Sequence, residues 1–83
     1  MNLSEVNLSG VNLSGANLSG VNFYRANLEG ANLEGANLNT ATLYAATFEG
    51  ANLEGATLQW AHADHWTVWP EGFDPEAGEV VIK

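Results

Sequence analysis

Three side chains near the end of the sequence have the residue types that bind metals or transfer protons. His62, Asp64 and His65 lie within a few residues of one another, and imidazole and carboxylate groups are common zinc ligands. A closed zinc site needs a fourth ligand, but none is nearby and the chain contains no Cys. We therefore expect these side chains to pack or to form hydrogen bonds, and we predict no metal site.

No other arrangement of catalytic residues is visible. The sequence contains no paired nucleophile and base, no glycine-rich loop that would cradle a phosphate, and no metalloprotease motif. We therefore expect no catalytic residues and no cofactor. The function of such a chain has to come from the surface that its fold presents.

A five-residue unit repeats without a slip between Asn2 and Trp60. Each unit is centred on a large apolar residue, and from Val6 onward Ala or Val stands two positions before each centre. The centres are Leu3, Leu8, Leu13, Leu18, Phe23, Leu28, Leu33, Leu38, Leu43, Phe48, Leu53 and Leu58.

A strict period of five fits neither an α-helix nor a regular strand. On a helix, positions five apart advance by about 140° net and scatter around the axis, and each interior Gly would cost about 1 kcal/mol relative to Ala. A short extended segment with a corner every five residues fits better. Ala26 and Leu28 then share one face, and Gly30 supplies the positive φ of a type II turn. One unit cannot bury its own Leu, so the units have to stack into a solenoid.

These units resemble the repeat of the pentapeptide-repeat family, A-[DN]-L-x-x. Residues 26–30 and 51–55, both Ala-Asn-Leu-Glu-Gly, match the motif outright. The resemblance implies an all-β fold, a right-handed quadrilateral parallel β-helix with four pentapeptides per coil and hence three coils. Two mild departures do not threaten that fold: Val replaces Ala at Val6, Val11 and Val21, and Thr replaces Asn at Thr42, Thr47 and Thr57.

The period breaks after Trp60, which divides the chain into a repeat tract (1–60) and a degenerate repeat with a C-terminal cap (61–83). The run from Trp69 to Pro75 is similar to a segment that follows the repeats in other members of the family. A terminal element has to cover the core of the last coil. We expect four aromatic side chains to do so: Trp60, Trp66, Trp69 and Phe73.

Local signals predict two short elements within the cap. Asp74 can cap a short helical turn that has Pro75 as its first residue and ends at Gly78. Residues 80–82 are apolar and β-branched and are predicted to form a short strand.

If the coil takes 20 residues, as the resemblance implies, residues 20 apart lie one above the other. We then predict three stacked pairs: Tyr24 with Tyr44, Glu29 with Glu49, and Glu34 with Glu54. The tyrosine pair serves either as a recognition spot or as an aromatic ladder that stabilises its face, and the glutamate pairs give too few ligands for a cation. Glu5 should form an exposed ion pair with Arg25, worth about 0–1 kcal/mol.

The chain is acidic, with ten Asp and Glu against two Lys and Arg and a formal charge of −8. Such a surface repels nucleic acids and anionic membranes, so we expect neither as a direct partner. There is no 18-residue apolar span and no basic N-terminal region before an apolar run. The expected location is therefore the cytoplasm.

Two functions are consistent with this sequence. The first is a structural or protein-binding module that contacts an unknown protein partner through the three stacked pairs. The second is implied by the resemblance, because some pentapeptide-repeat proteins are acidic mimics of duplex DNA that bind a type II topoisomerase such as DNA gyrase. We also expect weak self-association through residues 1–20, because an open solenoid end offers unpaired backbone groups and apolar side chains.

Overall fold

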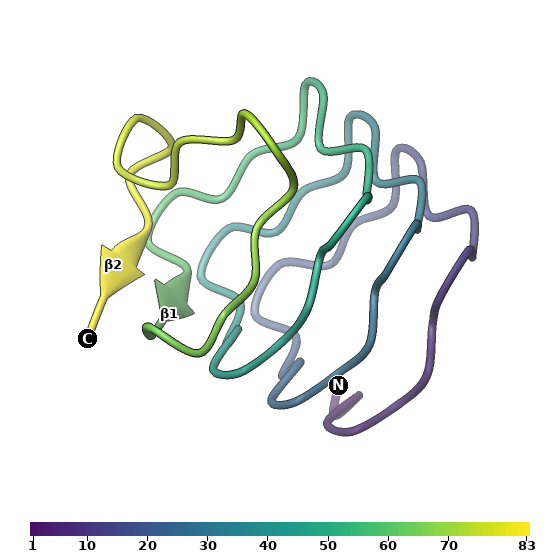
Figure 1. The fold of residues 1–83 in the computed structure, drawn as a ribbon, viewed down its shortest axis with the longest axis horizontal. Coiled ribbons are helices and arrows are strands. Elements are labelled where there is room, and N and C mark those ends of the chain that lie inside the picture. Colours follow the sequence, from purple (N-terminus) through teal and green to yellow (C-terminus); the bar gives the residue numbers. More distant parts are fainter.

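The computed structural model describes all residues, 1–83, and shows a chain wound into stacked rectangular coils (Figure 1). Parallel bridges join residues 20 apart throughout the repeat tract, from Asn2 with Asn22 to Asn37 with Thr57. One coil therefore takes 20 residues and has four sides, each made by one pentapeptide. We number the sides by their centres: side 1, Leu3, Phe23 and Leu43; side 2, Leu8, Leu28 and Phe48; side 3, Leu13, Leu33 and Leu53; side 4, Leu18, Leu38 and Leu58.

Each corner is a tight turn whose third residue has a positive φ, as the repeat predicts. The amide of Ala26 donates to the carbonyl of Phe23 at 2.9 Å, and this contact recurs at the other corners of the repeat tract. The side chain of the Asn before the centre braces the turn: Asn27 Oδ1 accepts from the amide of Glu29 at 2.9 Å. Gly occupies many corners, but five other residues adopt the same left-handed conformation there: Glu5, Arg25, Thr40, Ala45 and Trp60.

The repeat centres fill the inside of the coil. The largest side chains that are fully buried are Phe23, Leu28, Leu33, Leu38, Leu43 and Phe48. Burial is incomplete at the N-terminal end, where Leu3, Leu8 and Leu13 are only partly buried because no coil lies beneath them in the structure. The predicted interior positions are therefore confirmed, with a gradient of burial along the axis.

Only two regular strands form, both near the C-terminus. Strand β1 (His62–Ala63) and strand β2 (Val81–Ile82) pair in parallel, with His62 opposite Val81. The 20-residue register holds from Thr42 to His62 and then slips by one residue, because Thr47 pairs with Val68. A single extra residue between these two bridges is thus what breaks the repeat. The structure contains no helix that could span a membrane.

Two of the four expected aromatic residues pack against the core. Trp69 stacks on the buried Phe48 with ring centroids 5.5 Å apart, and Phe73 stacks on Trp69 at 5.0 Å. The prediction was wrong for Trp60 and Trp66, which are 61% and 67% exposed. Trp60 takes the left-handed corner position (φ 64°), from which the side chain points away from the core, and Trp66 lies in the turn after Asp64.

The predicted turn after Asp74 is present, although it does not extend into a helix. Asp74 Oδ1 accepts from the amides of Glu76 (3.0 Å) and Ala77 (3.4 Å), and the amide of Gly78 donates to the Asp74 carbonyl at 3.3 Å. Glu79 has the positive φ that ends the turn. The chain then continues into β2, close to the strand predicted over 80–82.

Candidate protein-interaction surface

Tyr24 and Tyr44 occupy equivalent positions on side 1. The amide of Arg25 donates to the carbonyl of Tyr44 at 2.9 Å, which fixes the register between the two coils at this point. Tyr24 is exposed and Tyr44 is half-buried, and their rings form no aromatic contact with each other. The backbone, rather than ring stacking, holds this pair in register, so the structure gives no aromatic ladder here.

The four glutamates are also held in register by the backbone. Gly30 donates to the carbonyl of Glu49, and Gly35 to the carbonyl of Glu54, both at 2.9 Å. All four side chains, Glu29, Glu34, Glu49 and Glu54, are exposed, and none forms an ion pair. Like charges at this spacing repel each other, so a cationic partner at these positions would relieve the repulsion between the carboxylates.

The three pairs do not form one surface. Tyr24 follows a centre of side 1, Glu29 a centre of side 2, and Glu34 a centre of side 3. Successive sides of a square face different directions, so a flat partner can contact one pair and the edge of the next. The structure brings each pair together but distributes the pairs over three sides.

The expected ion pair on side 1 is confirmed. Arg25 Nη1 lies 3.8 Å from Glu5 Oε2, and the two side chains are 60% and 66% exposed. At this exposure the pair contributes about 0–1 kcal/mol. It leaves no unpaired cation on the repeat tract, where Arg25 is the single basic residue.

Asp64 has a structural role, because its carboxylate replaces a backbone acceptor at the end of the repeat. Asp64 Oδ1 accepts from the amides of Ala45 (3.1 Å) and Trp66 (3.0 Å), so the carboxylate occupies the place where the next coil would present a carbonyl. The buried hydroxyl of Thr67 lies beside it and donates to the Leu43 carbonyl at 2.7 Å. Burial raises the pKa of Asp64, but the hydrogen bonds outweigh it, and the pKa lies below its ordinary value.

The two histidines do not join Asp64 in a metal site. The structure contains no group of three His, Cys, Asp or Glu side chains arranged to hold a metal ion. The His65 ring lies 4.6 Å from the Trp66 ring, centroid to centroid, and His62 Nδ1 is buried without a hydrogen-bond partner. Of these three side chains, Asp64 alone makes hydrogen bonds with its side chain.

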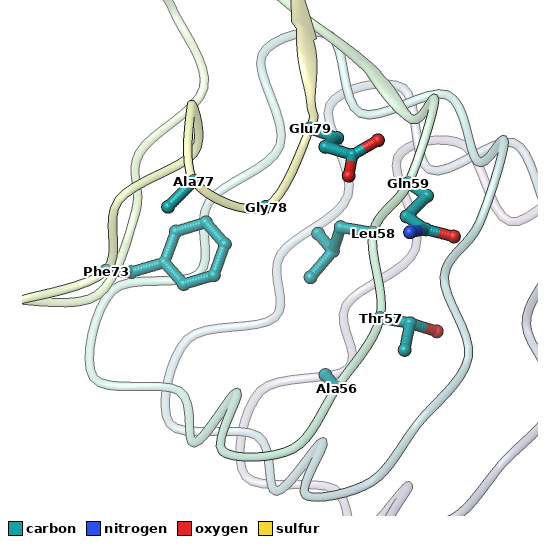
Figure 2. A pocket seen from close by; sticks show the side chains of 8 residues that line it. All are labelled: Ala56, Thr57, Leu58, Gln59, Phe73, Ala77, Gly78 and Glu79. Carbon is teal, nitrogen blue, oxygen red and sulfur yellow. The ribbon is translucent and has the colours of Figure 1, made fainter.

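Two cavities lie between the last coil of the repeat tract and the C-terminal segment, and no sequence pattern marks them. The first has a volume of about 220 Å³ and is lined by residues 56–59 on one wall and by Phe73 and residues 77–79 on the other (Figure 2). The second, about 280 Å³, lies between residues 51–54 and residues 70–73. Phe73 lines both cavities, so they adjoin along sides 3 and 4.

Comparison with known proteins identifies the repeat. The model of the family described as pentapeptide repeats matches residues 2–39 and 22–59, with eight copies of the unit. None of the curated proteins that were searched matches this sequence.

The solved structures that are similar to this chain include two pentapeptide-repeat proteins. A pentapeptide-repeat protein (Rfr23) from the cyanobacterium Cyanothece 51142 is 42% identical, with a TM-score of 0.75, over 82% of this chain and 53% of its own. This chain thus spans about half the length of the Cyanothece protein. The protein alr5209 from Nostoc Pcc 7120, also a pentapeptide-repeat protein, is 33% identical, with a TM-score of 0.57, over 99% of this chain and 80% of its own. With its repeat, its 20-residue coils and these matches, the chain belongs to the pentapeptide-repeat proteins, which fold as right-handed quadrilateral β-helices.

Proposed function

We propose that this chain is a non-enzymatic module that binds another protein or acts as a structural element. In this proposal, residues 1–60 form three coils of four pentapeptides, and residues 61–83 cover the C-terminal end of the stack. Proteins of this family are generally structural or interaction modules, which supports the assignment.

The observation that carries the proposal is the contrast between the interior of the coils, which the repeat centres fill, and the outer surface, which carries the side chains able to contact a partner. Centres such as Leu33 and Phe48 are fully buried against the neighbouring coils, so the interior is filled by the repeat itself. The side chains that can make specific contacts stand outside, in register. Tyr24 is 44% exposed without an aromatic neighbour, and Tyr is favoured at protein interfaces because it buries a large area at a low cost in entropy.

A binding comparison between matched variants tests this surface. The chain and the double variant Tyr24→Ser/Tyr44→Ser would be immobilised, and proteins retained from an extract of the source cells would be identified and then titrated as purified proteins. We expect the double variant to lose affinity for a purified partner by about tenfold or more, as for interface tyrosines elsewhere. Ser14→Ala, an exposed change at the equivalent position of side 3 in the first coil, is the control. If the double variant binds every partner as the parent does, the tyrosine pair is not the contact.

Mimicry of DNA is the second candidate, and net charge favours it. The chain carries −8, with exposed carboxylates on sides 2 and 3. Its dimensions, 26 × 24 × 22 Å, make it nearly as wide as it is long, so the charge does not extend along a rod. A supercoiling assay with a type II topoisomerase such as DNA gyrase tests this candidate. Inhibition of supercoiling at micromolar protein would support DNA mimicry. If there is no inhibition, the interaction module is the remaining candidate.

A further inference from the structure

The coil formed by residues 41–60 ends, on sides 3 and 4, with backbone amides that have no partner. One coil earlier, the amides of Leu33 and Leu38 donate to carbonyls of the next coil at 2.8 and 2.7 Å. The equivalent amides of Leu53 and Leu58 donate to no acceptor, and neither does the amide of Gly55 at the corner between them. Because the coils repeat, these three amides point toward the place where a further coil would lie.

The carbonyls that alternate with these amides are also free. The carbonyls of Ala31 and Ala36 accept from the amides of Asn52 and Thr57, at 2.9 and 3.0 Å. The equivalent carbonyls one coil later, of residues 51 and 56, accept no hydrogen bond. Residues 51–58 therefore form a strand edge with both donors and acceptors available, and such an edge is a template for another strand.

The C-terminal segment passes over this edge without pairing with it, and Leu53 and Leu58 are only 8% and 2% exposed beneath it. On sides 1 and 2 it pairs with the last coil, since Leu43 donates to His62 and Phe48 to Val68, both at 2.7 Å. It then leaves the edge in the loop drawn in yellow-green in Figure 1 and returns only where Trp60 donates to the carbonyl of Glu79 at 3.0 Å. The edge is closed at both ends and unpaired between them.

The space beside this edge is a groove with apolar walls and an acidic rim. Leu58 faces Phe73 across the first cavity, with Ala56 near its floor (Figure 2). Glu79 borders the first cavity, Glu54 and Glu71 border the second, and no Lys or Arg lines either. A segment that carries Lys or Arg therefore matches the rim, whereas a second copy of this chain, with a charge of −8, is repelled by it.

We propose that this groove binds an extended, basic segment of a partner protein, which adds a strand along residues 51–58. The added segment would follow the path of a further coil. Side chains two positions apart point inward, where small aliphatic residues would contact Ala56 and Phe73, both partly exposed. The Lys or Arg residues between them point outward to the carboxylates. Backbone hydrogen bonds supply affinity and the alternating side chains supply specificity, as in other cases of strand addition.

Titration with a synthetic peptide tests this site on the whole chain. The probe is acetyl-Val-Lys-Leu-Lys-Gly-Val-Lys-Leu-Lys-amide, which has aliphatic residues at the inward positions and Gly at the corner. With ¹⁵N-labelled protein, we expect the amide signals of Leu53, Gly55 and Leu58 to shift and their hydrogen exchange to slow. The same peptide with Glu in place of each Lys should bind at least tenfold more weakly. No shift of these three signals at millimolar peptide would overturn the proposal.

Two matched pairs of variants locate the binding. Gly78 lines the first cavity, and a Cβ there would meet its nearest atom, Phe73 Cζ, at 3.5 Å, an ordinary contact. Gly78→Leu should fill the cavity and abolish the shifts, whereas Ser9→Leu, which places the same side chain at an exposed position on side 2 of the first coil, should not. If Gly78→Leu fails to fold, the charge variants decide: Glu54, Glu71 and Glu79 changed together to Gln should weaken binding by about twofold to fivefold per carboxylate.

The control for the charge variants is the same triple change at Glu5, Glu29 and Glu49, which line neither cavity and are not paired with a carboxylate of the rim. Equal weakening in both triple variants would mean that net charge alone attracts the peptide, and it would overturn the proposal. So would shifts at the same three amides that depend on protein concentration without peptide, because a second copy would then occupy the edge. The site is separate from the tyrosine pair, so Tyr24→Ser/Tyr44→Ser should still bind the peptide, and each proposal can fail alone.

Discussion

At the scale of single residues, Asp64 shows how a side chain can end a pattern of backbone hydrogen bonds. On side 1 the corner amide of Arg25 donates to a carbonyl of the following coil, and the corner amide of Ala45 donates instead to the Asp64 carboxylate. The carboxylate accepts other hydrogen bonds as well, and together they hold its pKa below the ordinary value although burial raises it. A lowered pKa in the folded state means that the ionised form stabilises the fold.

This linkage gives Asp64 a predicted dependence on pH. The contribution of Asp64 is fully present above the pKa that the carboxyl has in the unfolded chain, and it is lost as the pH falls through the lower pKa of the folded state. We expect Asp64→Asn, which keeps an oxygen acceptor but cannot ionise, to be less stable than the parent at pH 7. Urea unfolding from pH 7 to pH 2 should show the difference shrinking toward acid. A difference that stays constant over this range would contradict the assignment.

The corner residues give a second prediction at this scale. Thr40 has a φ of 61° and Gly30 a φ of 69° at equivalent corner positions. A left-handed conformation costs a residue with a Cβ about 1–2 kcal/mol, and a β-branched residue more than most. Thr40→Gly should therefore raise the free energy of unfolding by about 1 kcal/mol. Gly30→Ala, where an added Cβ meets no atom within 4 Å, should lower it by a similar amount. Chemical denaturation measures the free energy of unfolding of both variants. If both substitutions change it in the same direction, the explanation is wrong.

At the scale of elements, the stability of a coil depends on the coils next to it. Leu33 and Leu8 are both repeat centres, but Leu33 is fully buried between two coils and Leu8 is only partly buried in the first. The C-terminal segment also depends on the last coil, because Trp69 and Phe73 extend the aromatic stack from Phe48. Trp66 does not join that stack, so its loss should matter less than the loss of Trp69.

We therefore predict different costs for the same substitution along the axis. Leu33→Ala should lower the free energy of unfolding by about 2–5 kcal/mol, because a cavity opens in a closed column. Leu8→Ala should cost clearly less, because water reaches the site already. Phe48→Ala should lower the free energy of unfolding by an amount in the upper part of this range, because Trp69 also loses its stacking contact. Equilibrium unfolding in urea compares the three, and a loss below about 0.5 kcal/mol at Leu33 would mean that this residue is not central.

At the scale of the whole molecule, the two ends of the stack differ. The C-terminal end is partly covered by residues 61–83, whereas at the other end the amides of Asn7, Asn12 and Asn17 have no backbone partner in the structure. The first coil also carries a single charged side chain, Glu5, which Arg25 neutralises. Open, nearly neutral strand edges are the sites where solenoids pair with another chain.

We predict weak self-association of the 1–83 chain through its first coil. A self-complementary end closes most simply as a two-fold dimer, with the partly buried leucines of residues 1–20 in contact. Light scattering over a concentration series should show dimers at high concentration for the parent and not for Leu8→Lys. A parent that stays monomeric at millimolar concentration would exclude this contact. A dimer that survives Leu8→Lys but is lost on changing Trp69 would place the contact at the C-terminal end instead.

The repeat and most of its consequences can be predicted from the amino-acid sequence. A period of five with Leu or Phe at each centre excludes a helix, and Gly at the corners specifies the turns, because both follow from local sterics and from the need to bury each centre. The pairs at Tyr24 with Tyr44 and at Glu29 with Glu49 followed once the 20-residue coil was assumed. The ion pair of Glu5 with Arg25 followed from the same register.

The path of the chain after the repeat breaks depends on tertiary contacts that the sequence pattern does not predict. The one-residue slip before Val68, the exposure of Trp60 and the unpaired amides of residues 51–58 all depend on how the C-terminal segment packs against the last coil. No periodic pattern describes that packing, because it is settled by contacts between residues far apart in the chain. For the same reason the free amides of Leu53 and Leu58, and the groove beside them, are visible only in three dimensions.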